Sequence, residues 1–287
     1  MPAAHRAHLE WTPSRLSVGR GRPDPRPPPS QGPSSRTGPI DLLHELRLAG
    51  MAQAFEEQLA MPDIGELAFD DRLSLLLERE KTEREQRRYL RLKGLAKLHL
   101  DATIEDINFK ANRGLDRSLI LRLASGQWIM DGQTVLVSGA TGSGKSYLAC
   151  ALGHQACRLG ISTRYYRVSR LLDALDLARA DGSYPKLVQR LARTWLLVLD
   201  DWGLASLSGQ SRHDLLEVLD DRYARRGTIL ASQLPVEHWH DVVGDPTFGD
   251  AILDRLVNNA HRITLKGGSM RRFYDSTKET SNPTDHT

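Results

Sequence analysis

The sequence predicts an α/β fold in which a parallel sheet is flanked by helices and preceded by a small all-helical domain. From residue 134 onward, short apolar segments alternate with amphipathic ones, which is typical of parallel strands joined by helices. Between residues 40 and 110, leucines recur at three- and four-residue steps, which predicts helices. A glycine-rich turn directly follows the first apolar segment and directly precedes a helix-forming one.

Residues 1–39 differ in composition from the rest of the chain. They hold nine of the fourteen prolines and six arginines but only two acids, Glu10 and Asp24. Without apolar periodicity, this composition predicts a disordered extension. We interpret it as a flexible basic arm or as a start assigned too far upstream, with an organelle transit peptide as the alternative; it lacks the apolar stretch of a secretory signal. Residues 273–287 are expected to form a flexible tail.

The bulk composition is that of a soluble globular protein. Of 287 residues, 40% are apolar and 26% are charged, which is enough apolar material for a sizeable core. No run approaches the roughly 18 consecutive apolar residues that a membrane span needs, so no membrane is expected. The net charge of +3 permits an anionic partner without requiring one.

The two cysteines bear on the cellular compartment. Cys150 and Cys157 lie seven residues apart on one predicted helix, a separation of about 10 Å at about 1.5 Å per residue, which is beyond disulfide reach. We therefore expect reduced thiols in the core and a cytoplasmic protein. Metal binding is the alternative, but no further cysteine supplies the usual zinc spacing.

The elements of the two predicted domains follow in chain order. Residues 40–110 are expected to form the helical domain, in which the apolar spacing leads into a long charged helix. Residues 111–272 are expected to form the sheet domain. Its predicted strands are 134–138, 161–168, 195–199, 227–232 and 261–265, and its predicted helices are 145–159, 169–180, 185–193, 209–226 and 247–259.

The turn after the first strand matches the phosphate-binding pattern G-x-x-x-x-G-K-[ST] in its strand-turn-helix context. Glycines let backbone N–H groups approach phosphate oxygens, and the following helix N-terminus favours negative charge. We expect Lys145 to reach the β- and γ-phosphates of ATP and the Ser146 hydroxyl to coordinate Mg²⁺. The alternative is an ordinary glycine-rich turn. The predicted loop consists of Gly139, Ala140, Thr141, Gly142, Ser143, Gly144, Lys145 and Ser146.

Two acids follow the predicted strand at 195–199, which is the Walker B pattern. Asp200 is expected to be the carboxylate that binds Mg²⁺. Asp201 is expected to polarise the attacking water as the general base. The alternative is that the acids cap the turn that includes Gly203. The phosphate-binding loop and the Walker B acids follow one another in the expected order, which favours a nucleotide site over a capped turn.

Two further residues are candidates for the catalytic site. Gln233 follows the strand at 227–232, where it would lie between the two Walker motifs and sense the γ-phosphate. Ser232 is the competing candidate. The structural alternative is that the Gln233 amide only bonds to backbone groups of the turn. Arg255, on a late amphipathic helix, is a candidate arginine finger. Its alternative is a surface arginine paired with Asp254.

A basic stretch at 86–97 holds five cations and no acid. At about 100° per residue, Arg87, Arg88 and Arg91 share one helical face, which predicts contacts with the phosphates of double-stranded DNA. A solvated face neutralised by the preceding glutamates is the alternative.

Taken together, these motifs resemble the IstB-like branch of the AAA+ ATPases, which is related to the helicase loader DnaC. The resemblance extends over about residues 41–272. It is carried by the two Walker motifs and by four further segments, 48–59, 181–186, 232–240 and 250–257. It leaves residues 1–39 outside the family pattern.

The resemblance implies a transposition helper of an insertion sequence, which assembles on DNA with ATP and activates a partner transposase. It also implies ATP hydrolysis with Mg²⁺ and a homo-oligomer whose site is completed by Arg255 of a neighbouring subunit, and it favours the sensor role of Gln233. Two features depart from the family. Asp201 stands where many AAA+ proteins have Glu, and little sequence follows the last strand to form a helical lid.

Two other functions share the nucleotide site. A replicative helicase loader has the same ATPase core but a different partner. A small-molecule kinase would transfer the γ-phosphoryl group to a metabolite, but the paired acids, Asp200 and Asp201, favour activation of water.

Overall fold

The computed structural model describes residues 38–110, 113–204 and 206–268. Nearly all of the predicted N-terminal extension, 1–39, and the whole of the predicted tail, 273–287, lie outside these residues. Among the described residues, no helix combines the length and the apolar character that crossing a membrane requires.

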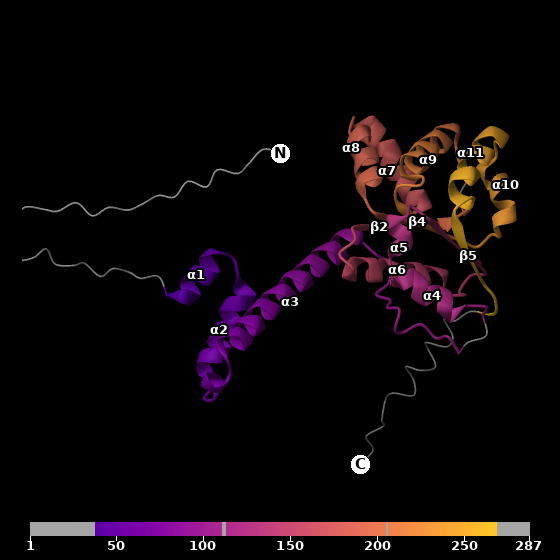
Figure 1. The fold of residues 1–287 in the computed structure, drawn as a ribbon. Helices are drawn as coiled ribbons and strands as arrows, with labels where there is room; N and C mark the ends of the chain where they lie inside the picture. The colour runs from indigo at the N-terminus through magenta and orange to yellow at the C-terminus, as the bar shows by residue number, and fades with distance from the viewer. Residues whose placement is uncertain (1–37, 111–112, 205, 269–287) are drawn as a thin grey trace, which may run out of the picture.

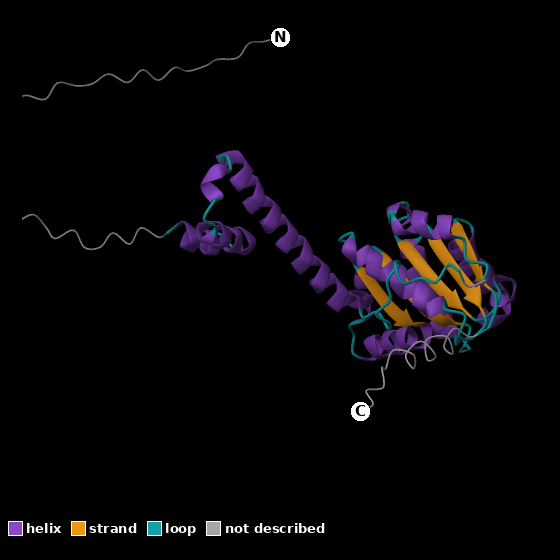
Figure 2. Ribbon diagram, turned by 90° about the horizontal axis from the view of Figure 1, so that it is seen from below, coloured by secondary structure: helices purple, strands orange, loops and turns teal. Residues whose placement is uncertain are grey.

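The predicted parallel sheet is confirmed. Every strand pair in it is parallel, and the strand order is β2-β3-β4-β1-β5. Because β4 lies between β1 and β3, the ends of all three strands meet at one edge of the sheet (Figure 2). The strands are β1 (Thr134–Gly139), β2 (Thr163–Arg167), β3 (Leu196–Trp202), β4 (Gly227–Ser232) and β5 (Ala260–Leu265).

Helices cover both faces of the sheet, as the alternating pattern predicts. One face packs against α4 (Arg117–Ala124), α5 (Gln127–Met130) and α6 (Lys145–Arg158). The other face is covered by α7 (Val168–Ala180), α8 (Tyr184–Arg193), α9 (Gly209–Arg222), α10 (Trp239–Val243) and α11 (Pro246–Val257).

Alternate strand residues enter the two apolar cores. On β3, Leu196 and Val198 point to the core beneath α6, whereas Leu197 and Leu199 point to the core beneath α7 and α9. All four side chains are fully buried. Strands buried on both faces read as continuous apolar runs, which is why the run before Asp200 indicates a central strand.

The N-terminal helices form an arm that projects from the sheet domain (Figure 1). Glu80 joins the arm's helices, because its Oε2 accepts the backbone N–H of Gly50 at 2.8 Å and of Met51 at 3.3 Å. These groups belong to the first turn of a helix, which a carboxylate stabilises. The arm consists of α1 (Pro39–Glu45), α2 (Ala49–Ala60), the short 3-10 helix at Ile64–Glu66 and the long helix α3 (Phe69–Ala96).

Among the described residues of the arm, those in the last turns of α3 contact the sheet domain. Leu92 and Ala96 are buried against Cys157 of α6, and Arg164 of β2 donates a hydrogen bond to the Leu95 carbonyl at 2.7 Å. After α3, the side chains of residues 102, 104 and 107 enter the core beneath α6. The chain therefore joins the sheet core soon after Ala96, ahead of the expected boundary at residue 110.

Candidate functional site

The candidate site lies at the carboxyl edge of the sheet, where β1, β3 and β4 end. This is where open parallel sheets bind ligands, because the loops that follow the strands converge there. The loop after β1 leads into α6, the acids end β3, and Gln233 follows β4.

The loop from Gly139 to Ser146 has a backbone that requires glycine. Gly139 has φ 152° and Gly144 has φ 100°, both in the region that side chains rarely adopt. A Cβ at Gly139 would lie 2.5 Å from the Leu265 carbonyl oxygen, so no larger residue fits. The turn leads directly into the N-terminus of α6, and backbone N–H groups at a helix N-terminus favour a bound phosphate.

The polar side chains of this loop have distinct surroundings. Lys145 is 8% exposed, and its Nζ donates a hydrogen bond to the Ala140 carbonyl at 2.9 Å, across the loop. The Ser143 Oγ is buried and has no hydrogen-bond partner among the described residues. Ser146 is the second residue of α6 and is partly buried. A buried ammonium and an unpartnered hydroxyl beside a helix N-terminus fit a bound phosphate group.

Asp200 is held in a fixed orientation inside the sheet edge. Its carboxylate is 2% exposed; Oδ2 accepts the Tyr165 hydroxyl at 2.8 Å and Oδ1 accepts the Asp201 N–H at 2.9 Å. Burial, and then the Asp200 charge, raise the pKa of the Tyr165 hydroxyl, which therefore stays a donor. A carboxylate oriented in this way fits Mg²⁺, which proteins bind through one or two oxygen side chains together with substrate phosphates.

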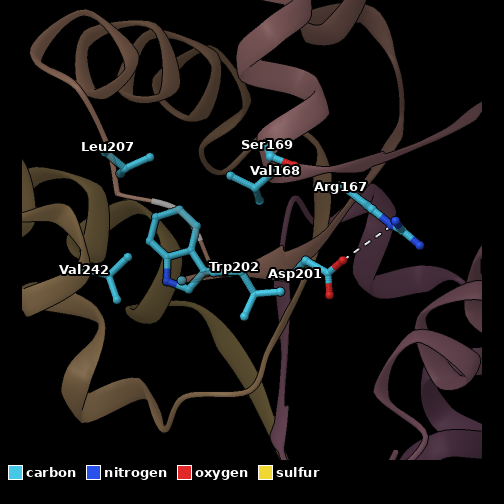
Figure 3. Close-up of a pocket in the computed structure, with 9 residues that line it drawn as sticks. Arg167, Val168, Ser169, Asp201, Trp202, Leu207 and Val242 are labelled. Atoms are coloured by element: carbon cyan, nitrogen blue, oxygen red, sulfur yellow. Dashed lines mark ion pairs between the residues drawn. The ribbon is translucent and has the colours of Figure 1, made fainter. Parts of the chain in front are cut away.

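Asp201 faces a different partner. The strand pairing of β3 with β4 is irregular between Leu199 and Trp202, and Asp201 adopts a left-handed φ of 62°. Aspartate tolerates this conformation better than most residues. As a result the Asp201 carboxylate turns toward Arg167, with Nε and Oδ2 3.4 Å apart (Figure 3). The two residues line a pocket of about 180 Å³ together with Trp202, Leu207 and Val242.

Gln233 lies beside the phosphate loop. Thr141 Oγ1 donates a hydrogen bond to Gln233 Oε1 at 2.8 Å, which places the amide at the cradle between β1 and β3. Ser232, the competing candidate, is fully buried, and its Oγ donates to the Trp202 carbonyl at 2.9 Å. The structure thus brings Gln233, and not Ser232, to the loop.

Arg255 lies far from this edge within its own chain. It lines a small pocket with Thr134, the first residue of β1, and Thr228, the second residue of β4, at the opposite edge of the sheet. Its guanidinium pairs with Asp220 and with Asp254, each at 3.1 Å. Arg255 therefore cannot complete the site of the chain to which it belongs.

The three arginines of the basic face have different surroundings. Arg87 pairs with Glu83 at 3.2 Å, as the alternative interpretation of this helix expects. Arg88 donates a hydrogen bond to the Gly160 carbonyl at 2.7 Å, which fastens α3 to the end of α6. Arg91 is exposed. On the shared face, Arg88 therefore attaches the arm to the sheet domain, whereas Arg87 and Arg91 face the solvent.

Sequence reasoning missed three residues at the site, Arg113, Tyr165 and Arg167. Arg113 is 8% exposed, and its Nη1 contacts the Ser143 carbonyl at 3.4 Å behind the phosphate loop. Tyr165 and Arg167 come from β2 and contact the two acids of β3. The sequence indicates only that Tyr165 and Arg167 belong to a strand. Their spacing from the Walker motifs does not indicate that this strand lies beside β3.

Comparison with known proteins now decides the family. The model of the family described as IstB-like ATP binding protein matches residues 41–278. The chain belongs to this IstB-like family. Relatives are named as insertion sequence ATP-binding proteins: one from Sinorhizobium fredii is 50% identical over 81% of this chain and 95% of its own length. The one of IS1162 from Pseudomonas fluorescens is 53% identical over 68% of this chain and 85% of its own.

Two solved structures share the fold of this IstB-like chain. The crystal structure of the DnaC helicase loader matches with a TM-score of 0.50 at 20% identity, covering 60% of this chain and 100% of that one. AMPPCP-bound DnaA from Aquifex aeolicus matches with a TM-score of 0.51 at 18% identity, covering 65% and 58%. The family model and the relatives confirm the resemblance of the sequence to the IstB-like family, and with it ATP binding as the property that the family's description names.

Proposed function

We propose that this IstB-like protein is an ATP-hydrolysing, DNA-binding helper for transposition of an insertion sequence, which assembles on duplex DNA with ATP and activates a partner transposase. The observation that carries the proposal is the convergence of the phosphate loop, the Walker B acids and Gln233 at one sheet edge. The names of the relatives support the insertion-sequence setting. The buried, unpaired Cys150 and Cys157 are consistent with the cytoplasm.

In this proposal each side chain has one task. The loop N–H groups and Lys145 bind the phosphates, and Ser146 with Asp200 would hold Mg²⁺, which when bound neutralises charge on the phosphate oxygens. Asp201 accepts a proton from the attacking water, and Gln233 positions the γ-phosphate. Because Asp201 pairs with Arg167, its carboxylate must leave that partner before it can act as a base.

The oligomer is the second part of the proposal. Arg255 lies opposite its own site, so it can act as a finger only toward a neighbouring subunit. The arm carries large apolar side chains that its own helices leave exposed, such as Leu46 at 66%, Leu59 at 65% and Phe69 at 67%. Apolar surface of this kind favours contacts between subunits.

A steady-state ATPase assay tests the enzyme role. The protein should hydrolyse ATP in the presence of Mg²⁺, and duplex DNA should raise the rate. Asp201→Asn should lower kcat about 10²-fold or more, the range typical of a lost general base, and leave ATP affinity intact. Asp176→Asn, at an exposed position on α7, is the matched control. An unchanged kcat in Asp201→Asn would contradict the assignment of the base.

A helicase loader remains the alternative, since it requires the same ATPase core and differs only in the partner. Strand transfer by the transposase of the same insertion sequence distinguishes the two. We expect the protein to stimulate strand transfer when ATP is present. Stimulation of helicase loading onto single-stranded DNA, without any effect on strand transfer, would favour the loader.

A further inference from the structure

A buried arginine lies directly against the backbone of the phosphate loop. Arg113 is 8% exposed, and its Nη1 donates a hydrogen bond to the Ser143 carbonyl at 3.4 Å. A Cβ built at Gly144 would lie 2.7 Å from the same Nη1, so only the absence of a side chain at Gly144 leaves room for the guanidinium. The guanidinium therefore packs at the residue that precedes Lys145 and the start of α6.

The charge of Arg113 has no acidic partner among the residues that the structure describes. Its Nη2 donates to the Asn108 carbonyl at 3.1 Å, so both acceptors of the guanidinium in this part of the chain are neutral. Its Nε is buried and has no hydrogen-bond partner there. Buried charges in proteins are normally paired with an opposite charge, because removing them from water is costly. Arg113 thus lacks a counter-charge, and a phosphate group bound to the adjacent loop would supply one.

The contact with Ser143 also orients one peptide group of the loop. In a planar trans peptide, the C=O of one residue and the N–H of the next point in opposite directions. Because Arg113 holds the Ser143 carbonyl, the N–H of Gly144 points away from the guanidinium. Gly144 is the N-cap of α6, and the N–H groups at a helix N-terminus have no partner within the helix. Arg113 therefore fixes the direction of an N–H group that can donate to a phosphate oxygen.

The backbone of Arg113 is attached beside the loop through the end of β5. Its carbonyl accepts the N–H of Lys266 at 2.8 Å. β5 pairs with β1 up to Leu265, and the Leu265 carbonyl oxygen lies 2.5 Å from the position of a Cβ at Gly139. The end of β5 therefore contacts both the phosphate loop and the segment that carries Arg113. These contacts hold the guanidinium against the loop.

We propose that Arg113 is a positioning residue of the nucleotide site, which holds the Ser143–Gly144 peptide with its N–H toward the phosphates and supplies, in addition to Lys145, a cation that bound nucleotide neutralises. This inference rests on the proposed function and names a further residue for nucleotide binding. The N–H groups of such a loop bind the α- and β-phosphates, which ATP and ADP share. Arg113 therefore contributes to the binding of both nucleotides and not to the hydrolytic step.

The test compares Arg113→Met with the wild type by calorimetric titration with ADP and with a non-hydrolysable ATP analogue. Affinity for both should fall about 10- to 100-fold, the range for lost hydrogen bonds to a charged group. The KM for ATP should rise with kcat largely retained, because the lost interaction is made in the ground state and the transition state alike. Arg117→Met, at an exposed position on α4, is the matched control and should bind as the wild type does. Wild-type affinity in Arg113→Met, or a loss confined to the ATP analogue, would overturn the inference.

Thermal melts without nucleotide separate this role from a purely structural one. Replacing a buried ion with an apolar side chain is often neutral or stabilising. Since the guanidinium of Arg113 has few partners and no counter-charge among the described residues, nucleotide-free Arg113→Met should melt no lower than the wild type. A lower melting temperature would assign Arg113 to the fold and overturn the inference. A wild type that binds both nucleotides but hydrolyses no ATP would contradict the proposed function, and the affinity comparison would still support or overturn the role of Arg113.

Discussion

Thr141 in the phosphate loop donates a hydrogen bond to Gln233 at the end of β4, across 2.8 Å. The two residues are 92 positions apart in the sequence, and the bond forms because β4 lies directly beside β1. It connects the loop that would bind phosphate to the strand that separates it from the Walker B acids. This contact places Gln233 where the sensor role that we propose for it requires.

Gln233→Ala should uncouple nucleotide binding from hydrolysis. We expect kcat to fall at least about tenfold, as for the loss of a donor that stabilises charge in the transition state, while ATP affinity changes little. Steady-state kinetics and a fluorescent-nucleotide titration measure the two quantities. Gln189→Ala, at an exposed position on α8, is the control. Equal kinetics for Gln233→Ala and the control would remove Gln233 from the site.

Lys145→Ala should remove a buried charge from the cradle. Hydrogen bonds to charged groups contribute about 1.5–3 kcal/mol, so ATP affinity should drop about 10- to 100-fold or more. Calorimetric titration with a non-hydrolysable ATP analogue measures the loss. Lys186→Ala, on the exposed side of α8, should bind as the wild type does. Wild-type affinity in Lys145→Ala would contradict the assignment of the loop.

The arginines of α3 should separate into two classes. Arg87→Glu combined with Arg91→Glu should weaken DNA binding and lower the slope of log affinity against log salt by about 1.8, at about 0.9 for each lost phosphate contact. Arg88→Glu should instead lower thermal stability, because Arg88 binds the Gly160 carbonyl and fastens α3 to α6. Salt-dependent DNA titrations and thermal melts distinguish the classes. A salt slope unaltered in the double variant would place the DNA site elsewhere.

Arg222→Met should destabilise the sheet domain without changing ATP binding. Arg222 is 1% exposed and donates hydrogen bonds to the carbonyls of Leu191 at 2.6 Å, Thr194 at 2.7 Å and Gly227. Leaving these buried carbonyls without a donor should cost about 3 kcal/mol of the free energy of unfolding. Urea denaturation measures it. Arg225→Met, three residues away and exposed, should stay within about 0.5 kcal/mol of the wild type.

Local patterns were sufficient to predict the central elements. The apolar run before Asp200 and the glycine turn before Lys145 are signals within a few residues. The helix begins at Lys145 as expected, whereas the strand extends beyond its expected end at residue 199 and includes both acids. The alternation of strands and helices also predicts the parallel sheet.

The order of the strands has no such local signal, because it depends on which distant segments pair. For that reason Tyr165 and Arg113 could not be recognised, although both contact residues of the predicted motifs. The docking role of Arg88 escaped for the same reason, since Gly160 lies 72 residues away. The attachment of residues 102–107 to the sheet core was missed because their apolar side chains are few and follow no helical spacing.

Electron microscopy of the wild-type protein with duplex DNA, with and without a non-hydrolysable ATP analogue, shows whether the protein assembles on DNA in response to nucleotide. We expect rings or filaments of several subunits that form only when both DNA and nucleotide are present. Arg255, which lies at the opposite edge from its own phosphate loop, should then lie at the subunit interface. Monomers under every condition, or identical assemblies without nucleotide, would contradict the account.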